Sequence, residues 1–190
     1  MFSRTERLLL RPGWAEDAPA LADAIADPAI IGNLTRVPYP YGLDEAQAFL
    51  ANGWNPRQPQ LLIFSRTRGA PRLVGGCGIH AGTDERLELG YWIARPFWGL
   101  GFATEAADAV MRIARSTSLG TITSCHAADN HASSRVLRKL GFRPTGGHER
   151  HYSSVRGEDV DYIVYEDSGA LPQRADPAQE LYIDRTLVAA

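Results

Sequence analysis

The sequence predicts a single α/β domain in which helices flank a central, mixed and mostly antiparallel sheet. Short apolar runs typical of strands alternate along the chain with segments whose apolar residues recur at helical spacing. Two of the strand-like runs are joined by a polar segment of hairpin length, residues 66–71. The chain has 190 residues, 44% of them apolar and 22% charged, which suits one folded core and excludes a disordered chain.

The first part of the chain predicts one strand and two helices, which are joined by an irregular loop. Three leucines at residues 8–10 form the strand, and a Pro-Gly pair ends it. A helix follows from Asp17 until an Asp-Pro pair breaks it. Residues 35–42 contain two prolines and three aromatic or basic side chains, so they form a loop. Asp44 then caps a second helix, which Gly53 is placed to end.

The middle of the chain predicts three strands. Residues 61–64 and 73–79 are apolar runs on either side of the hairpin turn. The third strand, residues 87–93, has a single charge, Glu88, among apolar neighbours, so we expect it to lie centrally in the sheet. Residues 75–78 include three glycines, but they lie inside a strand and do not open a helix. Close packing is therefore expected there, and not a dinucleotide site.

Beyond residue 100, two helices alternate with strands. From Ala103 the apolar residues recur at helical spacing. A strand at residues 121–127 precedes a second helix, which Asn130 caps and Gly141 ends. A strand begins after this glycine, and the last one covers residues 160–165.

The domain is expected to span residues 1–166, with residues 167–190 as a C-terminal tail. The tail is rich in proline, alanine and charged residues over its first part. Its last apolar run, residues 181–188, either docks as an edge strand or frays.

Charge and cysteine content narrow the class of protein. Twenty basic and 22 acidic residues give a formal charge of -2, so nucleic acid is not an expected partner. No apolar run reaches the roughly 18 residues of a membrane-spanning helix, so no membrane association is expected. Cys77 and Cys125 lie in separate strand-like runs, which indicates free thiols, and no export signal is visible. We therefore expect a cytoplasmic protein. The five histidines lack the spacing and the partners of a metal site, so no metal is expected.

The most informative segment is the turn Trp98-Gly-Leu-Gly-Phe-Ala-Thr-Glu105, which lies between a strand and a helix. The first-turn N–H groups and the dipole of a helix attract anions, and glycine lets phosphate oxygens approach the backbone. The turn is therefore a candidate phosphate site, and a tight turn without a ligand is the alternative. A P-loop NTPase is excluded, because Lys139, the one lysine, lies far from these glycines.

Three separated segments together carry a family signature. They are Glu88-Leu-Gly-Tyr-Trp-Ile93, the glycine turn, and Asn130-His-Ala-Ser-Ser-Arg-Val-Leu-Arg-Lys-Leu-Gly-Phe142. In this order they resemble the GNAT superfamily of acyl-CoA-dependent N-acetyltransferases, most closely its RimJ/RimL-type branch. The resemblance covers roughly residues 5–165. It implies a sheet that is splayed between its fourth and fifth strands to admit the pantetheine arm of the cofactor.

The resemblance also implies acetyl-CoA as the donor and direct transfer of its acetyl group to a primary amine. In that superfamily the backbone amides of the glycine turn bind the pyrophosphate of coenzyme A. The residues expected at the cofactor are Ile93, Trp98, Gly99, Leu100, Gly101, Phe102, Ala103, Thr104, Asn130 and Ser133. Trp98 stands where the superfamily often has Gln or Arg, so a cationic contact is missing there.

Amide acetylation requires a neutral amine, a stabilised oxyanion and a stabilised thiolate. Glu88 is the expected base, because it matches the strand glutamate of several GNAT enzymes, and its apolar strand is expected to raise its pKa. The alternative is an edge glutamate that faces solvent opposite Arg86. By resemblance, Asn130 contacts the pantetheine side, and Ser133 is expected to stabilise the thiolate by hydrogen bonding. Helix capping alone also explains both residues. Many GNAT enzymes have a tyrosine acid where this chain has Leu137.

The loop between the first two helices often covers the acceptor pocket in GNAT enzymes. Arg36, Tyr39, Tyr41 and His80 are therefore expected to bind the acceptor, and simple packing of an aromatic loop is the alternative. The acceptor is either a protein N-terminus, such as that of a ribosomal protein, or a small-molecule amine. A non-catalytic acyl-CoA-binding sensor is the alternative function. The chain is expected to be a monomer or a homodimer.

Overall fold

The computed structural model describes residues 2–51, 55, 58–67, 69–82, 86–117 and 119–169. Its strands are β1 (Ser3–Arg4), β2 (Leu8–Arg11), β3 (Gln60–Ser65), β4 (Arg72–Ala81), β5 (Leu87–Ile93), β6 (Ile122–Ala127), β7 (Phe142–Ser153) and β8 (Glu158–Asp167). Its α-helices are α1 (Ala18–Ile25), α2 (Pro28–Ile31), α3 (Leu43–Ala51), α4 (Phe102–Ser116) and α5 (His131–Lys139).

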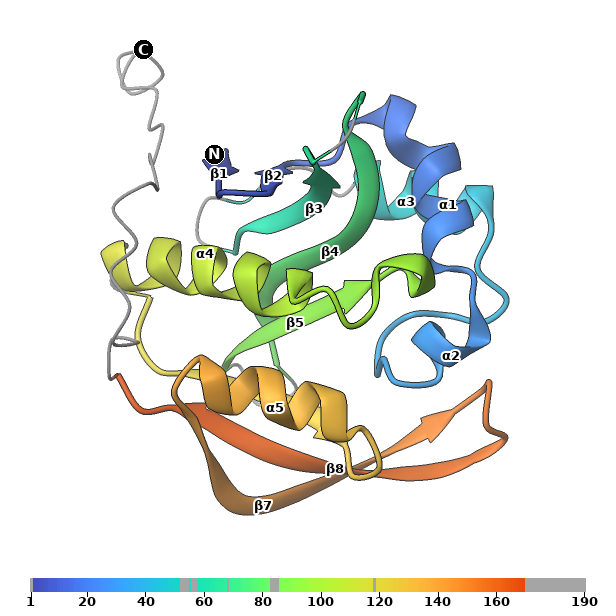
Figure 1. The fold of residues 1–190 in the computed structure, drawn as a ribbon. Coiled ribbons are helices and arrows are strands. Elements are labelled where there is room, and N and C mark those ends of the chain that lie inside the picture. Colours follow the sequence, from blue (N-terminus) through green and yellow to red (C-terminus); the bar gives the residue numbers. More distant parts are fainter. Residues whose placement is uncertain are drawn as a thin grey trace.

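The strands form one mixed sheet in the order β1-β2-β3-β4-β5-β6-β8-β7, shown in Figure 1. Neighbouring strands in this part of the chain pair antiparallel, except that β5 and β6 run parallel. The mixed, mostly antiparallel sheet is therefore confirmed, as is the central position of residues 87–93.

The parallel pair separates soon after it begins. Leu87 pairs with Ile122 and Glu88 with Thr123, and no later residue of β5 pairs with β6. The Ser124 hydroxyl donates a 2.8 Å hydrogen bond to the Leu89 carbonyl where the two backbones part. The splay expected between the fourth and fifth predicted strands is thus present, because these two strands are β5 and β6.

Helices cover both faces of the sheet. The buried stripe of α4, which includes Ala106 and Val110, packs with Leu89 and Ile93 of β5. On the other face, α1 and α3 pack against β3 and against Trp92 of β5. This division follows from the pleat of β5, since successive side chains of a strand point to opposite faces. The splay therefore joins two faces that the sheet otherwise separates.

The glycines of β4 confirm the expected close packing. A Cβ on Gly75 would lie 2.2 Å from the Trp92 carbonyl oxygen, and one on Gly76 would lie 2.6 Å from the Trp92 indole nitrogen. A Cβ on Gly78 would meet the Pro59 carbonyl oxygen at 2.7 Å. Only residues without a side chain let β4 lie this close to β3 and β5.

One of the predicted helix starts differs from expectation. Helix α3 begins at Leu43, so the expected capping by Asp44 is wrong, and the Glu45 carboxylate instead accepts a 2.8 Å hydrogen bond from the Gly42 amide. The expected start of the first helix is confirmed, because α1 begins directly after Asp17, whose carboxylate accepts a 2.8 Å hydrogen bond from the Trp14 amide. Its Oδ2 also lies 2.7 Å from the Arg11 guanidinium.

Two elements of the structure were not predicted from the sequence, and two predictions concern residues that the structure does not describe. The short strand β1 was not predicted, and a further helix, α2, follows the predicted break at Pro28. Gly53, the expected end of α3, and residues 181–188 lie outside the described residues. No helix in the described part of the chain is long and apolar enough to cross a membrane.

Candidate active site

A cavity of about 950 Å³ lies where β5 and β6 separate. It is lined by residues of both sheet faces, because the splay connects them. The expected site residues that line it are Arg36, Tyr41, His80, Glu88, Ile93, Trp98, Gly99, Gly101, Phe102, Ala103, Thr104, Asn130 and Ser133. Tyr39 and Leu100 do not line it, and they are 45% and 51% exposed.

The glycine turn forms one end of this cavity. Gly99 and Gly101 have φ angles of 77° and 83°, in the left-handed region where a side chain costs roughly 1–2 kcal/mol. Gly101 immediately precedes α4 and has no side chain to cap it, so the first-turn amides of α4 are left for another acceptor. The Trp98 indole donates a 2.6 Å hydrogen bond to the Ile93 carbonyl and ties the turn to the end of β5.

Glu88 lines the same cavity as the glycine turn. Side chains from three elements contact its carboxylate. The Cys125 thiol of β6 donates to Oε1 at 3.2 Å. Oε2 lies 3.6 Å from His80 Nε2 on β4 and 3.9 Å from Arg36 Nη2 on the loop after α2. The Glu88 side chain is only 17% exposed, and it pairs across the sheet with His80. It is therefore not the solvent-facing glutamate opposite Arg86 that the sequence left open.

The expected upward shift of the Glu88 pKa is wrong. Burial does raise the pKa of this carboxyl, but the interactions with His80 and Cys125 and the positive charge of Arg36 lower it by more. Glu88 is thus a carboxylate at neutral pH. Burial and the neighbouring Glu88 charge together raise the pKa of the Cys125 thiol, which therefore stays a neutral donor.

Arg36 also ties the loop after α2 to the sheet. Its Nη1 donates a 2.6 Å hydrogen bond to the Ala81 carbonyl at the end of β4, while the side chain stays 45% exposed. Arg36 therefore lines the cavity while it contacts both the Ala81 carbonyl and the Glu88 carboxylate.

The start of α5 places the Asn130 and Ser133 side chains at the cavity. The Asn130 side chain accepts a 3.1 Å hydrogen bond from the Ser133 amide, so the predicted cap is confirmed. This cap uses the backbone of Ser133 and leaves its hydroxyl free for another partner. That partner is Tyr91 of β5, whose hydroxyl oxygen lies 2.6 Å from Ser133 Oγ.

Tyr91 lines the cavity but was not among the expected site residues. Burial raises the pKa of its phenol, so Tyr91 remains a neutral hydroxyl donor. The available signal was strand alternation, which puts Tyr91 on the same face as Ile93, an expected cofactor residue.

Nothing among the described residues resembles a metal centre. No group of three or more His, Cys, Asp or Glu side chains in that part of the chain is arranged to hold a metal ion. Cys77 and Cys125 are both free thiols.

Comparison with known proteins gives the fold and the family. The chain is 30% identical over 173 residues to the uncharacterized N-acetyltransferase YoaA of Bacillus subtilis (strain 168), and the match covers 85% of this chain and 93% of YoaA. A GNAT-family acetyltransferase structure from Bacillus anthracis superposes with a TM-score of 0.73 at 22% identity, covering 92% and 100% of the two chains. The RimL ribosomal L7/L12 alpha-N-protein acetyltransferase in complex with coenzyme A superposes with a TM-score of 0.71 at 20% identity, covering 86% and 97%.

The two structural neighbours establish the fold that the three sequence segments implied. The model of the acetyltransferase (GNAT) domain matches residues 7–143, which include β5, the glycine turn and α5. The chain therefore belongs to the GNAT acetyltransferase family.

Proposed function

We propose that this protein transfers an acetyl group from acetyl-CoA to a primary amine by direct attack of the amine on the thioester. The observation that carries this proposal is that one cavity connects the open N-terminus of α4 with the Glu88 carboxylate through the splay. Membership of the GNAT family supports acetyl transfer.

The glycine turn suits the pyrophosphate of coenzyme A. An anion of two phosphates needs several N–H donors and an approach that no Cβ blocks. A Cβ on Gly99 would meet nothing within 4 Å, so the surface beside this backbone is open. When bound, acetyl-CoA supplies the activated acetyl group, and the fold of RimL, which holds coenzyme A, is similar.

Glu88 attracts and orients the amine. An acceptor amine arrives largely as an ammonium ion, since α-amino and lysine-type groups titrate near pH 8 and 10.4. The Glu88 carboxylate holds this cation beside the thioester carbonyl and accepts its proton, directly or through water. The lowered pKa of Glu88 means that the proton is passed on to water and is not kept on the carboxylate.

The Tyr91–Ser133 pair serves the leaving group. As the new C–N bond forms and the C–S bond breaks, negative charge moves to sulfur. If Tyr91 donates to Ser133 Oγ, the Ser133 proton is free to hydrogen-bond the departing thiolate. A hydroxyl is a far weaker acid than a thiol of pKa about 8.5, so Ser133 stabilises the thiolate and does not protonate it.

The acceptor is a primary amine of either a protein N-terminus or a small molecule. The RimL neighbour is named as an alpha-N-protein acetyltransferase, which supports the first class. The Glu88 carboxylate suits both classes of acceptor, because it attracts the cationic amine that both share.

The proposal is tested by calorimetric titration with acetyl-CoA, followed by thiol release with N-terminal peptides, amino acids, polyamines and aminoglycosides. Binding together with release for one class confirms the enzyme and names its acceptor. Binding without release across the whole panel overturns turnover and leaves the acyl-CoA sensor. The absence of binding overturns the assignment of the glycine turn.

A further inference from the structure

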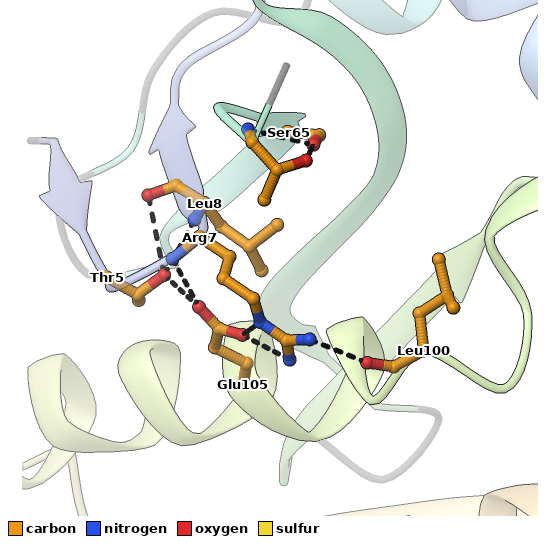
Figure 2. A network of polar contacts seen from close by, with 7 residues as sticks. Thr5, Arg7, Leu8, Ser65, Leu100 and Glu105 are labelled. Atoms are coloured by element: carbon orange, nitrogen blue, oxygen red, sulfur yellow. Dashed lines mark hydrogen bonds and ion pairs between the residues drawn. The ribbon is translucent and has the colours of Figure 1, made fainter.

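Arg7 contacts the glycine turn from outside the cavity. It lies in the short connection between β1 and β2, and its Nη1 donates a 2.9 Å hydrogen bond to the Leu100 carbonyl, the middle residue of the turn. Its Nε and Nη2 lie 2.7 Å and 2.6 Å from Glu105 Oε2 on α4. Figure 2 shows this guanidinium between the turn and the helix.

The base of the Arg7 side chain is itself fixed. The Thr5 amide donates to the Leu8 carbonyl at 3.0 Å, which closes the β1–β2 connection into a tight turn. The Arg7 carbonyl accepts from the Arg66 amide at 2.9 Å, just beyond β3. The guanidinium therefore extends from a backbone that the sheet holds in place.

Glu105 links this connection to the first turns of α4. Its Oε1 accepts from the Thr5 hydroxyl at 2.5 Å and from the Arg7 amide at 3.0 Å. Its side chain is 13% exposed. A carboxylate in the first turn of a helix interacts favourably with the helix dipole. Its negative charge, however, repels a second anion that binds at the same helix N-terminus. The Arg7 guanidinium neutralises that charge.

Arg7 also contacts the one residue between Gly99 and Gly101 that does not line the cavity. The Leu100 carbonyl is held by Arg7, and Leu100 does not line the cavity, whereas Gly99 and Gly101 do. A carbonyl oxygen that rotated toward the cavity would repel a phosphate oxygen.

We propose that Arg7 is a positioning residue for the pyrophosphate of coenzyme A, acting through the Leu100 carbonyl and Glu105. This inference rests on the proposed function, because it requires coenzyme A at the glycine turn. Arg7 sets the orientation of the turn and cancels the Glu105 charge before the anion binds.

The test compares two donors in Arg7→Gln: acetyl-CoA, and S-acetylpantetheine, which lacks the pyrophosphate. The variant loses charged hydrogen bonds, so Kd for acetyl-CoA rises about tenfold or more, and kcat/KM with acetyl-CoA falls by the same factor. With S-acetylpantetheine, kcat/KM stays within about twofold of the wild type. Arg112→Gln is the matched control, because Arg112 also pairs with a carboxylate, Asp108, but farther along α4.

Equal losses with both donors would show that Arg7 only supports the fold, and unchanged acetyl-CoA affinity would show that it has no role at the turn. Either result overturns the inference. If Arg7→Gln does not fold, Arg7→Lys takes its place, because one ammonium keeps the charge but cannot bridge Leu100 and Glu105 together. That variant should lose acetyl-CoA affinity selectively by about threefold or more. A wild-type protein that binds no acetyl-CoA overturns the proposed function instead.

Discussion

The Cys125 thiol donates a hydrogen bond to Glu88 Oε1 at 3.2 Å across the divergence of β5 and β6. The donor belongs to one strand of the splay and the acceptor to the other. This contact fixes the carboxylate at the point where the two faces of the sheet meet, beside the cavity. Burial raises the pKa of the Cys125 thiol, which therefore stays protonated and donates to the carboxylate. This hydrogen bond stabilises the charged form of Glu88 and lowers its pKa.

Replacing Glu88 by Gln should lower kcat by about a hundredfold or more, because it removes the group that takes the amine proton. The Kd for acetyl-CoA should change by less than about twofold, since Glu88 lies away from the glycine turn. The loss should be greatest below the pKa of the acceptor amine, where the amine is an ammonium ion, and should shrink as the pH approaches that pKa. Rates of wild type and Glu88→Gln from pH 6 to pH 10 provide the measurement.

The direction of the Glu88 pKa shift makes this pH profile specific. The pKa is lowered, so Glu88 is ionised at any pH above its ordinary value of about 4.3. The rise of activity through neutral pH therefore reports the acceptor amine, and Glu88 itself titrates only on the acid side. A wild-type to variant ratio that stays constant over the whole range would contradict its role as base.

Replacing Cys125 by Ala should raise the pKa of Glu88, because a hydrogen bond to the charged form is lost. The acid limb of the pH–rate profile should then move to higher pH. Cys125→Ser is the matched control, since its hydroxyl keeps a donor at the same position and should keep the limb near that of the wild type. If the acid limb of Cys125→Ala coincided with that of the wild type, the thiol would have no effect on the pKa of Glu88.

Ser133→Ala and Asn130→Ala should have different effects, because the cap and the hydroxyl are separate contacts. Asn130 accepts from the Ser133 backbone, so Ser133→Ala keeps the cap and removes only the hydroxyl that meets Tyr91. We expect Ser133→Ala to lower kcat about tenfold with little change in Tm. Asn130→Ala should cost about 1 kcal/mol of stability. Measurements of thermal unfolding and turnover for both variants separate the two roles. An unchanged kcat in Ser133→Ala would show that the Ser133 hydroxyl does not stabilise the thiolate.

The elements that the sequence predicted well are those whose pattern reflects which residues face the core. The period of α4 and the apolar run of β5 both arise from burial against each other. β1 was missed because two residues are too few to show a period, and its pairing with β2 is a tertiary contact. The α3 start was misplaced by two residues because Glu45 supplies a hydrogen bond from inside the helix.

The candidate site was predictable as a set of residues but not in its electrostatics. Glu88 and the glycine turn belong to continuous motifs, so their positions could be inferred directly. The groups that lower the Glu88 pKa come from β4, β6 and the loop after α2, which only the folded sheet brings together. Burial of Glu88 could be inferred from its apolar strand, whereas its partners could not, and so the sign of the shift was wrong. The Tyr91 contact with Ser133 was missed for the same reason.

Gly101→Ala should weaken acetyl-CoA binding, and Gly120→Ala should not. Both glycines are left-handed, with φ angles of 83° and 81°, so an added side chain strains each backbone by roughly 1–2 kcal/mol. Gly120 does not line the cavity, whereas Gly101 lines it next to the first-turn amides of α4, so a Cβ there would stand where a phosphate oxygen approaches. We expect similar losses in Tm, together with a rise of about tenfold in Kd for acetyl-CoA in Gly101→Ala alone. Calorimetric titration of the two folded variants measures this difference. Equal Kd values for acetyl-CoA would contradict the proposal that the glycine turn binds the pyrophosphate.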